Sequence, residues 1–197
     1  MDRPTANASA REANVLWRMA RRAERDHGYL VEHRIPALRL RQSRRGELLL
    51  PLCRAGVLVG MQCIPGRPGR VGARIGGDAP DCYAPTAPWK PGQPLIVAED
   101  WPSAVALHLM TGNPSWAVAG DGRLPAVAMA ARAMIGADGQ LFVAGDRTES
   151  GMHAADLAAS AAGAEILLPR LPLGAPRWLT TFNDVARWES GERRAWR

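Results

Sequence analysis

The sequence predicts an α/β protein in which a mostly parallel sheet flanked by helices follows a small basic α+β subdomain with a β-hairpin. Three observations predict this class. After residue 94, short apolar runs alternate with helical segments, as parallel strands joined by helices do. Before that point, two apolar runs are separated by a short turn, as in a hairpin. The chain has 197 residues, 47% of them apolar, which suits one ordinary domain or two small ones.

The N-terminal segment is expected to contain one helix. Residues 1–9 are polar and are expected to form a disordered tail. Residues 10–25 have apolar side chains at spacings of three and four, which is typical of a helix. The apolar stripe consists of Leu16, Met19, Ala20 and Ala23. Arg18, Arg22 and Arg25 recur on another face of this helix, which either contacts phosphate or is simply solvated.

A β-hairpin is predicted next, at residues 47–64. Its strands are the apolar runs 47–53 and 57–64, and Arg54-Ala55-Gly56 forms the turn. The following segment, residues 65–94, is dominated by Pro and Gly and leaves room only for short strands near Arg74 and Tyr83. Its last part, residues 86–94, has the composition of a linker.

The second half alternates strands and helices. Strands are predicted at residues 95–98, 116–119, 141–144 and 165–168. Helices are predicted at residues 102–110, 124–135 and 151–162, with Gly112, Gly136 and Gly163 just beyond their ends. The expected organisation is therefore a tail at 1–9, the basic subdomain at 10–93, the sheet domain at 94–190 and a basic tail at 191–197.

Composition excludes several classes. The sequence has no apolar run of eighteen residues and no apolar signal region, so no membrane association is expected. Its three cysteines form no CxxC pair, which argues against a zinc ribbon or a disulfide framework and suits a reducing cytoplasm. No P-loop is possible because the single lysine, Lys90, lies outside any Gly-Lys-Ser/Thr motif. HExxH and GxSxG motifs are also missing.

Charge is distributed unevenly along the chain. Residues 1–98 carry a formal charge of +8 and residues 99–197 one of −2, and every basic residue except one is arginine. This pattern suits a polyanionic partner on the basic half and metal-binding or catalytic carboxylates on the acidic half. A solvated, arginine-rich surface would produce the same pattern.

Acidic residues follow three of the four predicted strands. Glu99-Asp100, Asp121 and Asp146 each come directly after a strand or one residue beyond it. The carboxyl ends of parallel strands share one edge of a sheet, where function collects. Carboxylates that converge there repel one another unless a cation lies between them, and Mg²⁺ suits such a site. Each acid alone would also be explained as a helix N-cap.

These motifs resemble the Toprim domain of primases carried by phages and plasmids. Residues 95–104 (LIVAEDWPSA) are similar to the family's strand, Glu-Gly pair and helix, with Asp100 in place of the glycine. Residues 143–148 (VAGDRT) are similar to its strand and Asp-x-Asp motif, with Thr148 in place of the second Asp. Residues 181–185 (TFNDV) resemble its Asp-Phe-Asn-Asp-Leu stretch, and residues 26–30 (DHGYL) its His-Pro-Tyr-Leu. The resemblance covers roughly residues 12–190.

The resemblance implies a DNA primase that makes short primers on single-stranded DNA by nucleotidyl transfer. Glu99 and Asp146 would be the catalytic residues and would bind Mg²⁺ or Mn²⁺. Asp100, Asp121 and Glu149 are further candidate metal ligands, and no zinc is expected. Single-stranded DNA and nucleoside triphosphates would be the partners, with a separate helicase or replication protein as another. The candidate phosphate-binding residues are Arg18, Arg22, Arg25, Arg34, Arg39, Arg41, Arg54 and Arg147.

Two departures from the family pattern leave alternatives open. Thr148 removes one anion from the Asp-x-Asp motif, and Asp100 adds a side chain where the family has a bare backbone. The chain would then be a degenerate Toprim module that binds nucleic acid or a replication partner without chemistry. A Toprim nuclease using the same acids is a further alternative.

Overall fold

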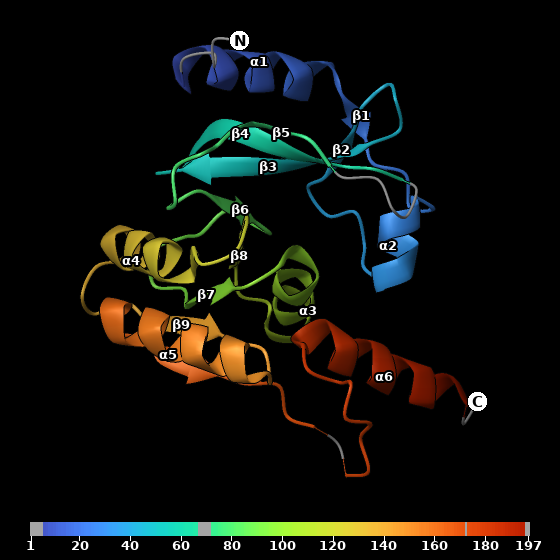
Figure 1. The fold of residues 1–197 in the computed structure, drawn as a ribbon, viewed down its shortest axis with the longest axis vertical. Coiled ribbons are helices and arrows are strands. Elements are labelled where there is room, and N and C mark those ends of the chain that lie inside the picture. Colours follow the sequence, from blue (N-terminus) through green and yellow to red (C-terminus); the bar gives the residue numbers. More distant parts are fainter. Residues whose placement is uncertain (1–5, 67–71, 172, 196–197) are drawn as a thin grey trace. The chain divides into compact units, whose positions relative to one another are not determined.

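A computed structural model describes residues 6–66, 72–171 and 173–195 of the chain (Figure 1). The chain divides into two compact units, Met1–Pro85 and Thr86–Arg197. This boundary differs from the one expected between residues 93 and 94. Thr86 belongs to the second unit because its amide donates to the Ser115 carbonyl and its hydroxyl accepts from the Ser115 amide, both at 2.9 Å.

The first helix, α1 (Ala6–Met19), differs from its predicted bounds at both ends. Residues 6–9 of the expected disordered tail are helical, whereas residues 1–5 lie outside the described part of the chain. The helix ends before Arg21 because Arg21–Arg22 form strand β1, which pairs with β2 (Arg41–Gln42). The prediction of one helix face with three arginines is therefore wrong: Arg22 lies in β1 and Arg25 in a turn.

The first unit contains an antiparallel sheet, and its predicted hairpin is confirmed. The hairpin consists of β3 (Leu48–Arg54) and β4 (Val57–Ile64). β3 also pairs with β2 and with β6 (Tyr83–Pro85), and β4 pairs with β5 (Arg74–Gly76). The two short strands expected near Arg74 and Tyr83 are thus present, and β1 and β2 are strands that the apolar pattern missed.

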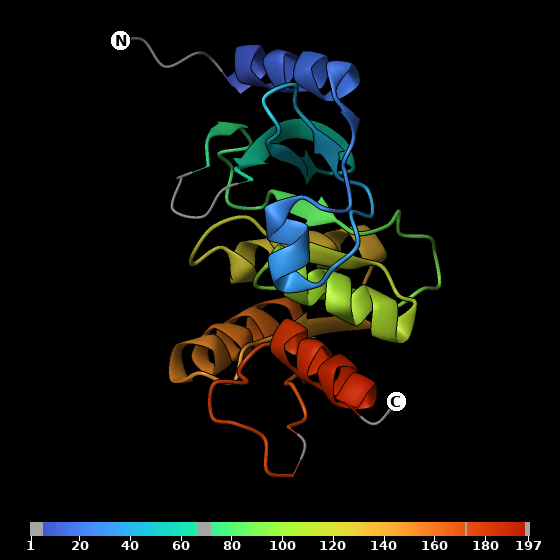
Figure 2. The ribbon, with the colours of Figure 1, turned by 90° about the vertical axis from the view of Figure 1, so that its right-hand side faces the viewer.

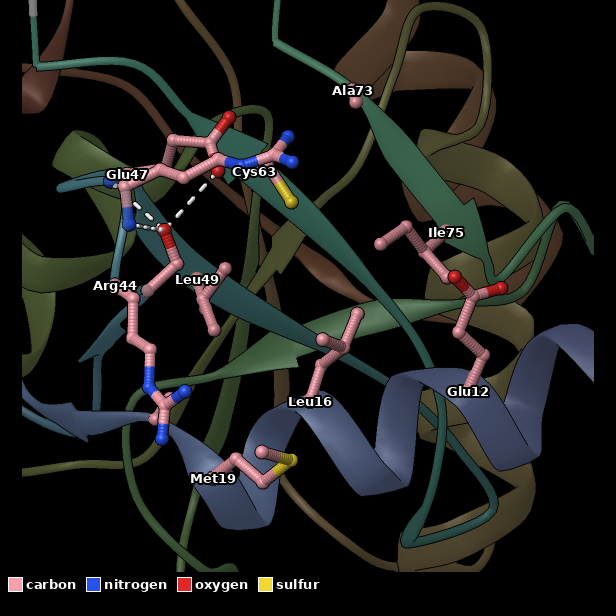
Figure 3. Close-up of a pocket in the computed structure, with 12 residues that line it drawn as sticks. Glu12, Leu16, Met19, Arg44, Glu47, Leu49, Cys63, Ala73 and Ile75 are labelled. Atoms are coloured by element: carbon pink, nitrogen blue, oxygen red, sulfur yellow. Dashed lines mark hydrogen bonds between the residues drawn. The ribbon is translucent and has the colours of Figure 1, made fainter.

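Helix α1 lies across β4 and β5 and covers one face of this sheet. A small core joins them, in which Ala13, Met61 and Leu49 are each at most 2% exposed and Cys63 is 6% exposed. Beside this core lies a cavity of about 430 Å³ between the helix and the strands (Figure 3).

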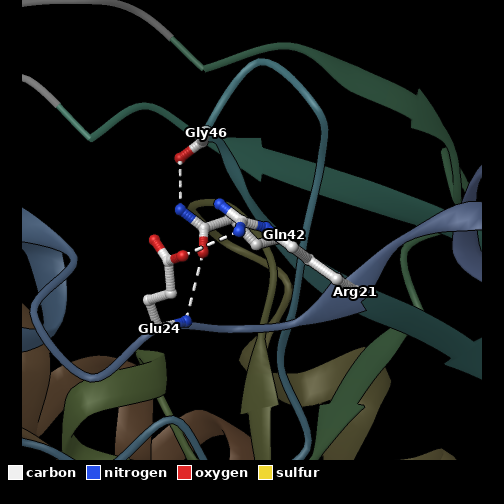
Figure 4. Close-up of polar contacts among 4 residues, drawn as sticks. All are labelled: Arg21, Glu24, Gln42 and Gly46. Atoms are coloured by element: carbon white, nitrogen blue, oxygen red, sulfur yellow. Dashed lines mark hydrogen bonds and ion pairs between the residues drawn. The ribbon is translucent and has the colours of Figure 1, made fainter.

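A buried amide holds the edge of the first unit together (Figure 4). Gln42 is 5% exposed; its Oε1 accepts from the Glu24 amide and its Nε2 donates to the Gly46 carbonyl, both at 3.1 Å. Arg21 and Glu24 form an ion pair at 2.7 Å beside it. A short helix, α2 (Gly28–His33), follows, and the side chain of His27 is its N-cap.

The second unit is built on a four-stranded parallel sheet, as the alternating pattern predicts. Its strands are β7 (Leu95–Ala98), β8 (Ser115–Val118), β9 (Leu141–Ala144) and β10 (Glu165–Leu167). Their spatial order is β8-β7-β9-β10, and every neighbouring pair is parallel. All four residues of β7 are at most 1% exposed, as expected for a central strand covered on both faces.

Helices α3 (Trp101–Thr111), α4 (Leu124–Ile135) and α5 (Glu149–Ala162) pack on this sheet, and α6 (Phe182–Ala195) packs on α3 (Figure 2). Helix α4 also packs against α5. The strand pattern predicts the first three crossover helices, whereas α6 was not expected. α6 includes residues 191–195 of the expected basic tail, and residues 196–197 lie outside the described part. Among the described residues, no helix is both long and apolar enough to cross a membrane.

One arginine links the ends of α4 and α5. Arg132 Nε donates to the Ala162 carbonyl and its Nη2 to the Gly163 carbonyl, at the end of α5. Its Nη1 contacts the carbonyls of Gly136, Ala137 and Gly139, just beyond α4. The guanidinium therefore satisfies carbonyls at both helix C-termini, where a positive charge is also favourable.

Candidate functional site

The structure brings two of the predicted acids together at the carboxyl edge of the parallel sheet. β7 and β9 are neighbours, and Ala98 is in register with Ala144. Glu99 directly follows β7, and Asp146 follows β9 after Gly145. The backbone amide of Asp146 donates a hydrogen bond of 3.3 Å to Glu99 Oε1. Both side chains are half-buried.

Burial and mutual repulsion make both acids harder to ionise. Burial, and then the negative charges of Glu99, Asp100 and Asp184, together raise the pKa of Asp146 to about 7. Burial also raises the pKa of Glu99, and the charge of Asp100 adds to this, against the opposing effect of the hydrogen bond from the Asp146 amide. Several carboxylates therefore act on one small region of low solvation.

Asp100 has a structural task in addition to its charge. Its Oδ1 accepts a 2.6 Å hydrogen bond from the Ser103 amide, so Asp100 is the N-cap of α3. Pro102 follows in the first turn, where its missing N–H costs nothing. Trp101, which lies between Asp100 and Pro102, is 3% exposed and is part of the core. The side chain that replaces the expected glycine thus starts the helix behind Glu99.

Thr148 is also a helix cap. Its Oγ1 accepts a 3.0 Å hydrogen bond from the Gly151 amide at the start of α5. The position that resembles the second Asp of Asp-x-Asp is therefore occupied by a side chain that binds backbone and carries no charge. Since Asp is at least as good an N-cap as Thr, the structural task alone does not require threonine here.

Two glycines allow α5 to begin close to Asp146. A Cβ on Gly145 would lie 2.6 Å from the Ala155 Cβ. A Cβ on Gly151 would lie 2.8 Å from the Asp146 carbonyl oxygen. Distances this short do not occur between real side chains and their neighbours, so both positions need glycine for the close approach of helix and strand end.

Asp184 is a member of the site that was not among the expected residues. Its carboxylate accepts from the amides of Thr180 and Thr181, at 3.3 and 3.1 Å, and its own amide donates to Thr181 Oγ1 at 3.0 Å. This reciprocal cap starts α6. The Arg147 amide donates to the Thr180 carbonyl at 2.8 Å, which holds this cap beside the end of β9. The sequence feature that could have pointed to Asp184 is the motif at residues 181–185 (TFNDV).

Asp121 and Glu149 are placed differently from the two central acids. Asp121 is exposed in the turn after β8, and Glu149 is exposed in the first turn of α5. Neither is among the charges that raise the pKa of Asp146 or Glu99. Within the described residues, no three His, Cys, Asp or Glu side chains are grouped closely enough to hold a metal ion by themselves.

The two central carboxylates nevertheless suit a magnesium site in which the protein supplies only part of the coordination shell. Mg²⁺ in phosphate-handling proteins is held by one or two carboxylates, and waters and substrate phosphates complete its shell. Glu99 and Asp146 supply two half-buried carboxylates, and burial together with neighbouring negative charge raises the pKa of each. A divalent cation would compensate that charge, so these residues fit the ion.

The arginines proposed to bind phosphate divide into two sets. Arg41 donates to the Trp17 carbonyl at 2.6 Å and lies over the Trp17 ring at 4.9 Å, and Arg54 pairs with Asp81 at 2.7 Å. These two are engaged in internal contacts of the first unit. The others have exposed side chains, as Arg54 does, and of these Arg18 donates to the Asn14 carbonyl at 3.3 Å; they are Arg18, Arg22, Arg25, Arg34, Arg39 and Arg147.

The fold is that of primase catalytic domains. Neither a protein-family model nor a curated protein sequence matches the chain. Among solved structures, the primase fragment of the bacteriophage T7 primase-helicase protein matches with a TM-score of 0.62 at 14% identity, over 86% of this chain and 72% of that one. The DnaG primase catalytic domain bound to single-stranded DNA matches with a TM-score of 0.60 at 13% identity, over 96% of this chain and 78% of that one. The two TM-scores show a shared fold, and at identities this low they show the fold alone.

Proposed function

We propose that this protein is a DNA primase-like enzyme that synthesises short primers on single-stranded DNA by Mg²⁺-dependent nucleotidyl transfer. The contact between the Asp146 amide and the Glu99 carboxylate carries this proposal, because it places two acids of raised pKa at one sheet edge. The primase-like fold supports it, since the solved domains that share the fold are primases.

Glu99 and Asp146 would hold the metal ion. Mg²⁺ bound there would neutralise negative charge that develops on the transferred phosphoryl group. Glu99, whose raised pKa makes it a better proton acceptor than an ordinary carboxylate, would also accept the proton of the attacking hydroxyl. Asp184 and Asp100 would act through their charges, while their oxygens keep α6 and α3 in place.

Exposed arginines would position the polyanionic substrates. Arg147 is next to Asp146 and exposed, so it is our first candidate for a phosphate of the incoming nucleotide. Arg18, Arg22, Arg25, Arg34 and Arg39 of the first unit would contribute to binding of the template strand. Arg41 and Arg54 are weaker candidates because both already have internal partners.

The test is metal-dependent nucleotide incorporation on single-stranded DNA. The protein, Glu99→Gln and Asp146→Asn are each assayed with Mg²⁺ and with Mn²⁺, and Asp121→Asn serves as a matched control. We expect short products from the natural protein and the control, and a loss of at least 100-fold in both site variants, as removal of a metal ligand would produce. Full activity in both site variants would overturn the assignment of this site.

A non-catalytic role is the second candidate, and one observation favours it. Thr148 caps α5 and adds no charge to the acidic edge. In that case the protein would bind single-stranded DNA, or a helicase or other replication protein, without making primers. We then expect no product, together with DNA binding that weakens steeply as salt rises, because arginine contacts release counterions. Metal-dependent nicking of DNA without synthesis would instead indicate a Toprim nuclease.

A further inference from the structure

The cavity of the first unit has the size and composition of a small-molecule site. Its volume is about 430 Å³, within the ~300–1,000 Å³ of typical ligand pockets. It lies between α1 and the face of the sheet formed by β3, β4 and β5 (Figure 3). All of its walls belong to one compact unit, so its shape depends only on how α1 packs on the strands beneath it.

Apolar and sulfur-containing side chains line most of this cavity. Leu49, Cys63 and Ile75 form its floor on the strands, and Leu16 and Met19 face them from α1 (Figure 3). Leu16 is 38% exposed and Met19 is 61% exposed. Two large apolar side chains therefore point into an open space that the protein does not fill, and covering them would be favourable. Burial raises the pKa of Cys63, so this thiol acts as an apolar lining group.

One end of the cavity carries two arginines in a fixed turn. Ser43 Oγ accepts from the amides of Arg45 and Glu47, each at 3.2 Å, and the Ser43 amide donates to the Glu47 carbonyl at 2.9 Å. This turn presents Arg44 and Arg45 at the rim. Among the described residues, neither arginine is paired with a carboxylate.

Two acidic groups limit where in the cavity an anion can lie. Glu47 belongs to the same turn as Arg44 and Arg45. Its Oε2 accepts from Ser43 Oγ at 3.2 Å, and its charge contributes to the raised pKa of Cys63. Glu12 lines the wall formed by α1, near Ile75 and away from Arg44 (Figure 3). An anionic group is thus disfavoured at the floor and at the Glu12 side. It is favoured at the rim, where the two positive charges of Arg44 and Arg45 outnumber the single negative charge of Glu47.

We propose that this cavity binds a small amphiphilic anion, with its apolar body between α1 and the sheet and its carboxylate or phosphate group at Arg44 and Arg45. The apolar body covers Leu16, Met19 and Leu49, and the arginines satisfy the head group by charge-assisted hydrogen bonds. A medium-chain fatty acid and an aromatic monophosphate share this chemistry. The site is independent of the acids of the second unit and of the proposed function.

The first experiment uses anilinonaphthalene sulfonate, an apolar aromatic probe with one anionic group, and the uncharged probe N-phenylnaphthylamine. Fluorescence titration of the full chain should show one saturable site for each probe. Arg44→Gln combined with Arg45→Gln should weaken sulfonate binding about tenfold and leave the uncharged probe unchanged. Arg170→Gln combined with Arg177→Gln makes the same charge change on exposed residues of the second unit and should change neither affinity.

A second variant fills the cavity. Ala73 lines it from an exposed position at the sheet edge, so Ala73→Phe should abolish binding of both probes while circular dichroism and Tm stay as in the natural protein. Displacement of the sulfonate probe by decanoate would show that the cavity accepts a ligand with a flexible apolar chain. Displacement of the probe by naphthyl phosphate would show that it accepts a ligand with a flat aromatic body. Failure of both competitors, or equal sulfonate affinity in the Arg44→Gln/Arg45→Gln variant, would overturn the proposal.

Discussion

The Asp146 backbone amide donates to the Glu99 carboxylate across two neighbouring parallel strands, although the residues are 47 positions apart in sequence. They meet because the crossover from β8 to β9 passes over β7, which makes β7 and β9 neighbours. The hydrogen bond stabilises the charged form of Glu99, while the charge of Glu99 makes Asp146 harder to ionise. One geometric relationship therefore has opposite effects on the two acids.

Asp146→Asn should stabilise the metal-free protein at alkaline pH. The folded-state pKa of about 7 lies above the ordinary value of 3.8, so the folded state holds this proton more tightly than the unfolded state does. The resulting stability is fully present below about pH 4 and is lost as pH rises through 7. Urea unfolding in EDTA at pH 8.5 should therefore show the variant more stable by about 1–4 kcal/mol.

The same comparison at pH 3 should show little difference between the two proteins, because Asp146 is then largely protonated in both the folded and the unfolded state. Asp121→Asn, at an exposed acid of the same edge, is the control and should match the natural protein at both pH values. A variant that is equally stable at pH 8.5 would mean that Asp146 is well solvated.

Thr148→Asp should preserve the fold and strengthen metal binding. Asp accepts the Gly151 amide as readily as Thr does, so the cap of α5 is kept and unfolding should change by less than about 0.5 kcal/mol. The added carboxylate follows Asp146 by two residues and raises the negative charge of the edge. Isothermal titration with Mn²⁺ should show tighter binding by about tenfold. Thr148→Val removes the cap without adding charge, and should cost about 1 kcal/mol of stability without any gain in affinity.

Gly145→Ala should destabilise the second unit by about 1–3 kcal/mol, because the new methyl group would overlap with Ala155. A double-mutant cycle tests the cause. Ala155→Gly alone removes a methyl group from a helix and costs about 1 kcal/mol, but combined with Gly145→Ala it should restore part of the loss. Strictly additive losses would show that the two positions do not contact each other.

His27 should make the first unit less stable in mild acid. Burial lowers the pKa of this side chain, against the opposing effects of the Gly46 carbonyl and of Asp26 and Glu24. Its Nδ1 accepts the Tyr29 amide at 3.3 Å, which only the form without a proton on Nδ1 can do. The stability from neutral His27 is present above pH 6.5 and is lost as pH falls below it.

Thermal unfolding between pH 5 and 7.5 measures this effect. His27→Asn keeps an N-cap side chain and should show a weaker loss of Tm toward pH 5 than the natural protein. His153→Gln, at an exposed histidine, should retain the full dependence. A parallel dependence in all three proteins would assign the acid sensitivity to other groups.

The sequence was sufficient to predict the parallel sheet. Its strands at 95–98 and 141–144 have the predicted bounds, because fully buried strands read as short apolar runs with glycine or proline near their ends. The position of Glu99 and Asp146 on one edge then followed from the geometry of parallel strands. The hairpin was also predictable from its two apolar runs.

Elements whose stability depends on polar contacts were harder to predict. Strands β1 and β2 have only two residues each and are arginine-rich, and a buried Gln42 amide stabilises this region. Helix α6 begins with a reciprocal cap between Thr181 and Asp184 that ties it to the end of β9. The prediction of an arginine-lined helix face was wrong because α1 ends at Met19, where the chain turns into the pairing of β1 with β2. The spacing of apolar residues in the sequence carries no information about these polar interactions.

Arg132 has a consequence for how the acidic edge can move. It pins the C-terminal ends of α4 and α5 to each other, at the end of the sheet opposite Glu99 and Asp146. Helices joined at one end can separate at the other only by pivoting, since sliding would break several hydrogen bonds at once. Within α4 and α5, amide hydrogen exchange should therefore be slower near their C-terminal ends than in the first turn of α5. The acids lie near the opposite, unlinked ends of these helices, where a small change in the angle between the helices gives the largest displacement.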